Sequence, residues 1–155
     1  MSFTFQKSER LCSKKIIEQL FETRQAVNGS DTSRSKDVSS FNLYPFRFAW
    51  LRTSFESEFP VQVLFVVSRR NFPKATQRNR IKRQLRELYR MEKERLYQSL
   101  SASGLQFAVM IAYISKEKKM IFADAKKIFH KSILRLNAEL EKNNQRPVPA
   151  DDPIL

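Results

Sequence analysis

The chain has 155 residues, 41% of them hydrophobic, which is enough for one domain with one core and too little for two. Its 29 Lys and Arg outnumber 16 Asp and Glu, and the net charge of +13 implies an anionic partner, with nucleic acid ahead of an anionic membrane surface. No apolar run is long enough to span a bilayer, and the N-terminus lacks an apolar signal core. We therefore expect a cytoplasmic protein with no membrane role. The lone Cys12 excludes an internal disulfide and a thiolate metal cluster.

The first predicted helix covers residues 13–24, with Ser13 as a candidate N-cap. Its apolar face, at helical spacing, consists of Ile16, Ile17, Leu20 and Phe21. Residues 27–40 are nearly devoid of apolar groups and rich in Ser and Asp, so they are predicted to form a mobile loop.

Two strands are predicted next, over residues 44–53 and 60–68. The first alternates, with Phe46, Phe48 and Trp50 on one side and Arg47, Ala49 and Leu51 on the other. Alternation alone leaves open which side meets a partner. The second strand is apolar on both faces, as central strands are, and Pro73 prevents its continuation.

A long helix is predicted over about residues 77–98, then an apolar strand over 105–114 and a final helix over about 121–141. The stripe of the final helix consists of Phe122, Ala125, Phe129, Ile133, Leu136 and Leu140. His130 stands beside lysines on this helix, where an exposed or capping role is favoured over catalysis. Residues 143–155 hold three prolines and are predicted to be a disordered tail. The expected fold is an α/β (α+β) sandwich with a single sheet, in one domain over residues 1–142.

The beginning of the long helix, RNRIKRQLREL (78–88), holds five cations and one acid. At about 100° per residue, the core-facing stripe consists of Ile81, Leu85 and Leu88 with Tyr89. A shoulder row beside this stripe consists of Arg78, Lys82 and Arg86, each four residues apart. An outer row, on the far half of the helix, consists of Asn79, Arg80 and Arg83.

This charge run is either a solvated helix face or a surface for a polyanion. Solvated faces usually mix signs, because a Glu four residues before a Lys or Arg stabilises a helix by about 0.2–0.5 kcal/mol. No acid lies between residues 78 and 86, and like charges at this spacing repel. A polyanion would explain the pattern, since each neutralised phosphate releases counterions. Arg69 and Arg70, after the second strand, add cations at the same end of the sheet, but the residues alone do not decide between RNA and DNA.

The segment SRRNFPKATQRNRIKRQLRELYR, residues 68–90, resembles the protein component of bacterial ribonuclease P, with that family's RNR signature and its surroundings. ERLCSKKIIEQLF near the N-terminus and the strand YPFRFAWL support the resemblance, which covers roughly residues 8–140. It implies a mixed sheet packed by helices, as in a ribosomal-protein domain, with the order αβββαβα. It also implies a left-handed crossover carrying the RNR helix, where the general rule favours a right-handed one.

The resemblance further implies the protein subunit of an endoribonuclease whose catalytic RNA, using Mg²⁺, removes the 5′ leader of precursor tRNA. The implied partners are the ribonuclease P RNA subunit and precursor tRNA, with no protein partner. No catalytic residue and no bound cofactor are expected in the protein, and metal sites are left unassigned. The residues agree, because hydrolysis by the protein would need clustered carboxylates or histidines to hold metal ions. The sequence has one His and no convincing acidic pair.

Carried over by position, the resemblance assigns two surfaces. The RNA subunit is expected to contact Asn79, Arg80, Arg83, Arg69 and Arg70. The cleft for the 5′ leader, called the leader cleft below, is expected to be lined by Arg78, Lys82, Arg86, Ile17, Phe21, Arg47 and Ala49. Apolar groups beside cations suit a single strand, whose unstacked bases can lie on them. Ile17 stands where several relatives have an aromatic residue, which favours packing over base stacking at that position.

Two other functions compete with this one. A structural RNA-binding protein, such as a ribosomal protein or an RNA-assembly factor, would share the charge, the fold and the phosphate contacts. A DNA-binding helix in the major groove would require a two-helix motif with a tight turn, which Pro73 and the strand before the basic helix argue against.

Overall fold

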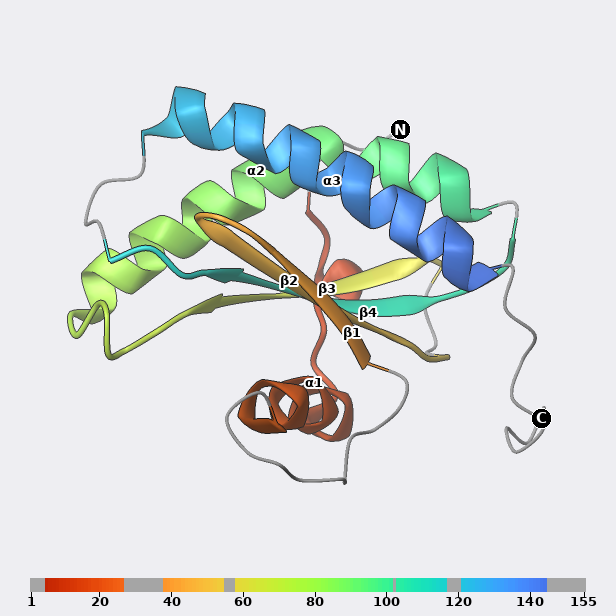
Figure 1. Ribbon diagram of the computed structural model, residues 1–155, viewed down its shortest axis with the longest axis horizontal. Helices are drawn as coiled ribbons and strands as arrows, with labels where there is room; N and C mark the ends of the chain where they lie inside the picture. The colour runs from red at the N-terminus through yellow and green to blue at the C-terminus, as the bar shows by residue number, and fades with distance from the viewer. Residues whose placement is uncertain (1–4, 27–37, 55–57, 102, 117–120, 145–155) are drawn as a thin grey trace.

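The computed structural model describes residues 5–26, 38–54, 58–101, 103–116 and 121–144 (Figure 1). In chain order its elements are the 3-10 turn η1 (Lys7–Glu9), helix α1 (Lys14–Ala26), strands β1 (Val38–Leu43), β2 (Phe46–Arg52) and β3 (Val61–Val67), helix α2 (Ala75–Ser101), strand β4 (Phe107–Tyr113) and helix α3 (Phe122–Asn144). Apart from the short η1, this order confirms the expected αβββαβα arrangement.

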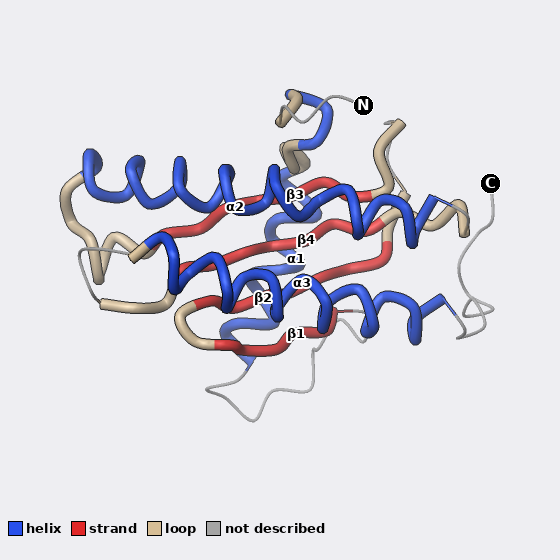
Figure 2. Tube along the Cα trace, turned by 90° about the horizontal axis from the view of Figure 1, so that it is seen from above, coloured by secondary structure: helices blue, strands red, loops and turns tan. Residues whose placement is uncertain are grey.

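The four strands form one mixed sheet in the order β1-β2-β4-β3. β2 pairs antiparallel with β1 and with β4, whereas β3 pairs parallel with β4. Helix α1 covers one face of the sheet, and α2 and α3 cover the other (Figure 1). Figure 2 is viewed from the side of the sheet that α2 covers. If the picture is rotated so that β3 and β4 point upward, with α2 in front, β4 lies to the left of β3, whereas a right-handed connection would place it to the right. The β3–α2–β4 connection is therefore left-handed, as expected from the resemblance.

The larger core lies between the sheet and helices α2 and α3. The predicted stripe of α2 is buried there, since none of Ile81, Leu85, Leu88 and Tyr89 is more than 1% exposed. From the sheet, the Phe46, Phe48 and Trp50 side of β2 enters the same core. Phe129 of α3 packs edge-on against Phe46, with ring centroids 5.3 Å apart. An aromatic contact of this geometry contributes about 0.5–1.5 kcal/mol of stability beyond that expected from the apolar area it buries.

A smaller core lies between the sheet and α1. Leu20 of α1 is completely buried against the opposite face of the strands, which contributes Ala49, Leu51 and Met110. Strand β4 separates the two cores, and all seven of its residues are buried. This explains why the sequence of β4 is apolar without alternation.

The prediction of a loop over residues 27–40 was wrong for residues 38–40, which belong to β1. This strand lies at the sheet edge, and Ser39 and Ser40 pair with Trp50 and Ala49 of β2. Edge strands are held by backbone hydrogen bonds and tolerate polar side chains. Because Ser39 and Ser40 are polar, the apolar pattern that predicts a strand was absent here. Residues 27–37 lie outside the described part of the chain.

Other predicted boundaries, and one predicted core residue, also needed correction. The strand predicted from residue 44 begins at Phe46, because Tyr44 and Pro45 form the turn from β1. Residues 143 and 144, assigned to the tail, complete α3, and residues 145–155 lie outside the described part. Phe122, placed in the core stripe, is 36% exposed because α3 is buried only from Ala125 onward.

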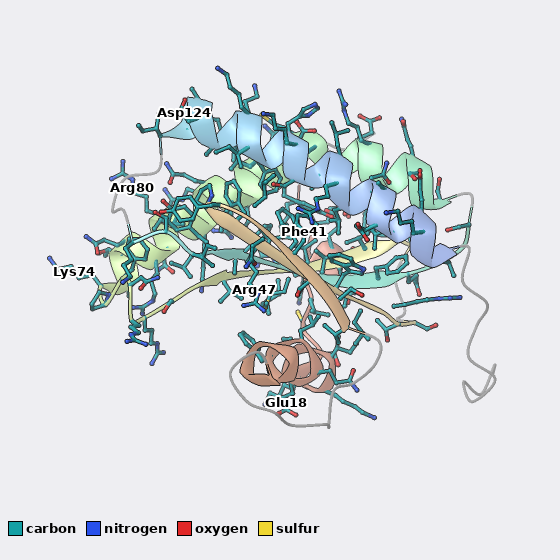
Figure 3. The ribbon with its side chains drawn as sticks, in the orientation of Figure 1. Glu18, Phe41, Arg47, Lys74, Arg80 and Asp124 are labelled. Carbon is teal, nitrogen blue, oxygen red and sulfur yellow. The ribbon has the colours of Figure 1, made fainter. Side chains whose placement is uncertain are left out.

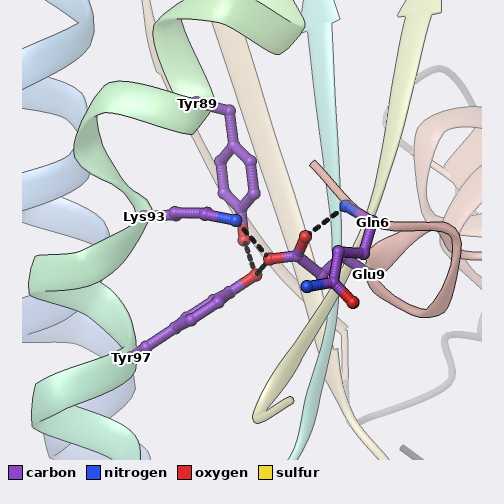
Figure 4. Close-up of polar contacts among 5 residues, drawn as sticks. All are labelled: Gln6, Glu9, Tyr89, Lys93 and Tyr97. Atoms are coloured by element: carbon purple, nitrogen blue, oxygen red, sulfur yellow. Dashed lines mark hydrogen bonds and ion pairs between the residues drawn. The ribbon is translucent and has the colours of Figure 1, made fainter. Parts of the chain in front are cut away.

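A buried polar network joins the N-terminal segment to the middle of α2 (Figure 4). The carboxylate of Glu9, which is 0% exposed, accepts hydrogen bonds from Lys93 Nζ at 2.8 Å and from the Tyr97 hydroxyl at 2.7 Å. The Tyr89 and Tyr97 hydroxyl oxygens are 3.0 Å apart. Burial raises the pKa of both tyrosines above the ordinary value, so both remain protonated at neutral pH. The carboxylate therefore has a cation and a hydroxyl donor in place of water.

We predict that Lys93→Met will lower the free energy of unfolding by about 3 kcal/mol, because it leaves the buried Glu9 carboxylate without its cation. Chemical denaturation would measure the change. The control is Arg95→Ala on the same helix, whose 60%-exposed side chain lies 3.9 Å from Glu92 and should contribute less than about 1 kcal/mol. Equal losses in the two variants would contradict a stabilising role for the buried pair.

Candidate nucleic-acid interface

The cations in the two halves of helix α2 differ in whether they form ion pairs. In its C-terminal half the cations face acids, with Arg90 on Glu87, Lys93 on Glu9 and Arg95 near Glu92. In its N-terminal half, none of Arg80, Lys82, Arg83 and Arg86 makes a hydrogen bond or ion pair to another described residue. Within the described ranges, these four cations at the beginning of α2 therefore have no acid as a partner.

The acid nearest to this cationic stretch does not neutralise it. Glu87 follows Arg86 directly and accepts hydrogen bonds from Arg90 on the C-terminal side. The Arg90 guanidinium lowers the pKa of the Glu87 carboxyl through this bond, so Glu87 is ionised and engaged at neutral pH. The Glu87 carboxylate therefore balances the charge of Arg90 and leaves the charge of the preceding cations unbalanced.

The two predicted rows differ in exposure, as the helical layout required. Asn79, Arg80 and Arg83 of the outer row are all exposed. Arg78, Lys82 and Arg86 of the shoulder row are half-buried beside the apolar stripe. Figure 3 shows Arg80 reaching outward near the beginning of α2, where Lys74 also projects away from the molecule.

Arg78 has a structural role that the sequence did not reveal. Its Nη1 donates to the carbonyl oxygens of Phe72 at 2.9 Å and of Pro73 at 2.8 Å. These bonds tie the loop after β3 to the first turn of α2 and satisfy two carbonyl groups that precede the helix. A helical layout gives the direction of the Arg78 side chain but not the carbonyls it meets.

Arg69 and Arg70 lie in this loop and are both exposed. A local hydrogen bond stabilises the turn of this loop, because the Arg70 backbone N–H donates to Ser68 Oγ at 3.1 Å. The cationic surface therefore includes the strand end, the loop and the start of the helix, as predicted.

The question of which side of β2 faces α1 is answered by the smaller core. Ala49 packs there with α1, and the partly exposed Ile17 and Phe21 belong to the same cluster. Three residues predicted to line the leader cleft are thus in one cluster. Ala49 is only 2% exposed and acts as packing, whereas Ile17 and Phe21 keep part of their apolar surface accessible.

Arg47 lies on the same face of the sheet, one row beyond this cluster (Figure 3). It pairs with Ala112 of β4, which pairs with Val66 of β3, so these three residues form one row across the sheet. The row leads to a hollow of about 140 Å³ lined by Val66, Ser68, Asn71, Ala112, Tyr113 and Ile114. This hollow opens at the carboxyl ends of the parallel strands, where α/β sheets commonly bind ligands.

Three residues at this end of the sheet were given no role from the sequence. Ser68 and Asn71 supply polar groups to the hollow, and Lys74 is an exposed cation directly before α2. The available signal was their position after a strand that pairs in parallel, because such strand ends are left open by the crossover.

Among the described residues, His130 and Cys12 are the other ones that could take part in catalysis or bind a metal ion. His130 Nδ1 lies 3.1 Å from both carboxylate oxygens of Glu92, which joins α3 to α2. Cys12 is exposed with a free thiol. Within the described ranges, no three His, Cys, Asp or Glu side chains are grouped to hold a metal ion. Likewise, no helix in the described ranges has the length and apolar character needed to cross a bilayer.

Comparison with known proteins gives one consistent family. The sequence model of the family described as Ribonuclease P matches residues 5–137. The chain is 43% identical over 63 residues to the ribonuclease P protein component of Chlorobium phaeobacteroides, and 43% identical over 61 residues to that of Chlorobaculum tepidum. These alignments cover 37% and 38% of this chain and 43% and 40% of the two relatives.

Solved structures support the same fold. The RNase P protein of Thermotoga maritima aligns with a TM-score of 0.55 and 18% identity, covering 82% of this chain and 96% of that one. The RNase P protein of Staphylococcus aureus aligns with a TM-score of 0.52 and 15% identity, covering 84% of this chain and 95% of that one. Because the family model matches most of the chain and includes both α1 and the cationic half of α2, the chain belongs to the ribonuclease P protein family.

Proposed function

We propose that this chain is the protein subunit of ribonuclease P, which binds the catalytic RNA and the 5′ leader of precursor tRNA and assists removal of that leader. The observation that carries the proposal is the N-terminal part of α2, where Arg80, Lys82, Arg83 and Arg86 pair with none of the described residues. Its cations are fixed on a helix anchored in the core, so binding a polyanion costs little ordering of the protein. A subunit that processes tRNA would work in the cytoplasm.

We assign the outer row, Arg69 and Arg70 to the RNA subunit. These groups are exposed and face away from the packed sheet, and arginine can bind a phosphate through two parallel hydrogen bonds. A folded RNA presents a broad anionic surface, which suits cations spread over a loop and a helix.

We assign the shoulder row and the α1 face of the sheet to the leader. Lys82 and Arg86 are half-buried beside the core, and Ile17 and Phe21 offer apolar surface on the α1 side. Cations that hold phosphates beside groups on which bases can rest bind a single strand without reading its sequence. Arg47 and the hollow next to the Ser68–Asn71 loop would extend this surface.

In this proposal the protein binds and positions, and the RNA subunit carries out the hydrolysis with Mg²⁺. The polar groups of the surface described above are cations, amides and hydroxyls. Such groups neutralise phosphate and lower the repulsion between two RNA molecules, so they reduce the Mg²⁺ concentration needed for assembly.

We expect that adding the protein to ribonuclease P RNA at low Mg²⁺ will raise the single-turnover rate of precursor-tRNA cleavage. The Arg80→Ala/Arg83→Ala variant should lose most of this stimulation, whereas Arg95→Ala, the matched change in the C-terminal half of α2, should keep it. The absence of stimulation by the unmodified protein would leave a structural RNA-binding protein as the better description.

Salt dependence provides a more specific prediction for the outer row. Each of Arg80→Ala and Arg83→Ala should reduce the slope of log affinity for the RNA subunit against log salt concentration by about one unit, because each removes a phosphate contact. Filter binding over a range of salt concentrations would measure the slope. A slope equal to that of the unmodified protein in both variants would remove these arginines from the interface.

For the shoulder row, we predict that Lys82→Ala will weaken binding of precursor tRNA to the assembled enzyme by about tenfold, or ~1.4 kcal/mol, as expected for a lost charged hydrogen bond. Binding of mature tRNA, which lacks the leader, should be nearly unchanged. Equal losses for the two tRNAs would mean that Lys82 does not contact the leader.

A further inference from the structure

The N-terminal segment before α1, residues 5–13, lies along the free edge of β3 and is called the strap here. Arg10 pairs in parallel with Val63, and the Leu11 N–H donates to the Val63 carbonyl at 3.0 Å. Gln62 Nε2 donates to the Ser8 carbonyl at 3.1 Å. The strap is thus fixed to the strand by backbone and side-chain bonds.

A second, larger hollow lies between the strap, the start of α1 and the sheet. Its volume is about 620 Å³, and it is open to solvent. The residues that line this strap hollow are Gln6, Lys7, Ser8, Arg10, Cys12, Ser13 and Gln62. Its position places it well away from the start of α2, because Gln62 is near the beginning of β3 and the loop to α2 follows the end of that strand.

The charge of the strap hollow results from the way the strap is anchored. Three strap residues turn inward: Phe5 packs against Tyr89, and Glu9 and Leu11 are buried. Glu9 is the only acid of residues 5–13, and its charge is matched by Lys93 inside the protein (Figure 4). Lys7 and Arg10 point outward and line the hollow without an acid among the lining residues.

The other polar groups of the hollow are suited to an anion. Ser8 and Ser13 carry hydroxyl donors, and Gln6 and Gln62 carry amide donors. Lys14 and Lys15, both exposed, follow directly at the start of α1, and Glu18 comes a full turn later. Two cations with several neutral donors form a site typical of phosphate binding.

The strap hollow is on the same face of the sheet as the α1-side residues of the proposed leader cleft, Ile17, Phe21 and Ala49. Along β3, Gln62, Leu64 and Val66 point to one side, and Leu64 and Val66 pack in the cluster that contains Ile17 and Phe21. Val66 lies four residues along β3 from Gln62, a distance of about 13 Å. A single strand of RNA lying across this face could therefore reach both the cleft and the hollow.

We propose that the strap hollow binds the phosphate backbone of the 5′ leader, at nucleotides farther from the cleavage site than those in the leader cleft. This inference rests on the proposed function. The leader is chosen over the RNA subunit because the outer row belongs to the opposite end of β3, whereas the strap hollow shares the face of Ile17 and Phe21. The long leader of a precursor would then gain affinity that a short leader cannot.

The test compares Lys7→Gln/Arg10→Gln with the unmodified protein, each assembled with the RNA subunit. Substrates would be precursor tRNAs with leaders of about four and about twelve nucleotides. We expect the variant to bind the long-leader precursor about three- to tenfold more weakly, and the short-leader precursor equally well. Lys7→Arg/Arg10→Lys, which keeps both charges, should restore long-leader binding.

Lys131→Gln, an exposed lysine of α3, is the matched control and should have no effect on either substrate. Thermal unfolding of the free protein would verify that the double variant is folded, since Arg10 also lies over the Phe5 ring at 5.7 Å. Equal weakening for both leader lengths, or no weakening, would overturn the proposal. The stimulation of cleavage on the short-leader substrate tests the proposed function separately, because it does not require the strap hollow.

Discussion

The need to cover β4 on both faces governs this fold. Every residue of the strand is buried, and it is flanked by β2 and β3, so an apolar layer is required on each side. Helices α2 and α3 supply one layer and α1 the other. Because β3 and β4 are parallel, α2 must start beyond their carboxyl ends and return across the sheet. The same constraint that buries the core therefore places the first turns of α2, with their cations, at the open end of the sheet.

Along its length, helix α2 has cations that stabilise the fold and cations that belong to the proposed binding surface. In its C-terminal half, Lys93 pairs with Glu9 and so joins α2 to the N-terminal segment, whereas Arg90 pairs with Glu87 within the helix. Nearer its N-terminus, Arg80, Lys82, Arg83 and Arg86 pair with none of the described residues, and they lie beside an apolar stripe that keeps the helix in place. Only Arg78 departs from this division, because it closes the loop after β3. In the proposed function, a binding surface on such a scaffold would lose little conformational entropy on binding RNA.

The parts of the fold that burial dictates were predictable from the sequence. The spacing of Ile81, Leu85 and Leu88 predicted both the helix and its buried side, and this in turn separated the two cationic rows. Strand β1 was not predictable in this way, because Ser39 and Ser40 depend on backbone pairing with β2. The Glu9–Lys93 pair joins residues 84 positions apart, and no local pattern links them. Likewise, the side of β2 that faces α1 depends on where α1 packs, and alternation within the strand contains no information about that.

The cations near the beginning of α2 also affect the stability of the free protein. Arg78, Lys82 and Arg86 repeat at a spacing where like charges repel, which weakens the helix by a few tenths of a kcal/mol per pair. Dissolved salt screens this repulsion and so favours the folded chain. The same salt would reduce the counterion gain expected to drive the proposed RNA binding. Higher ionic strength should therefore stabilise the free chain and weaken the proposed complex. A partner that binds only the folded chain would also raise its stability by mass action, which offsets the repulsion among these cations.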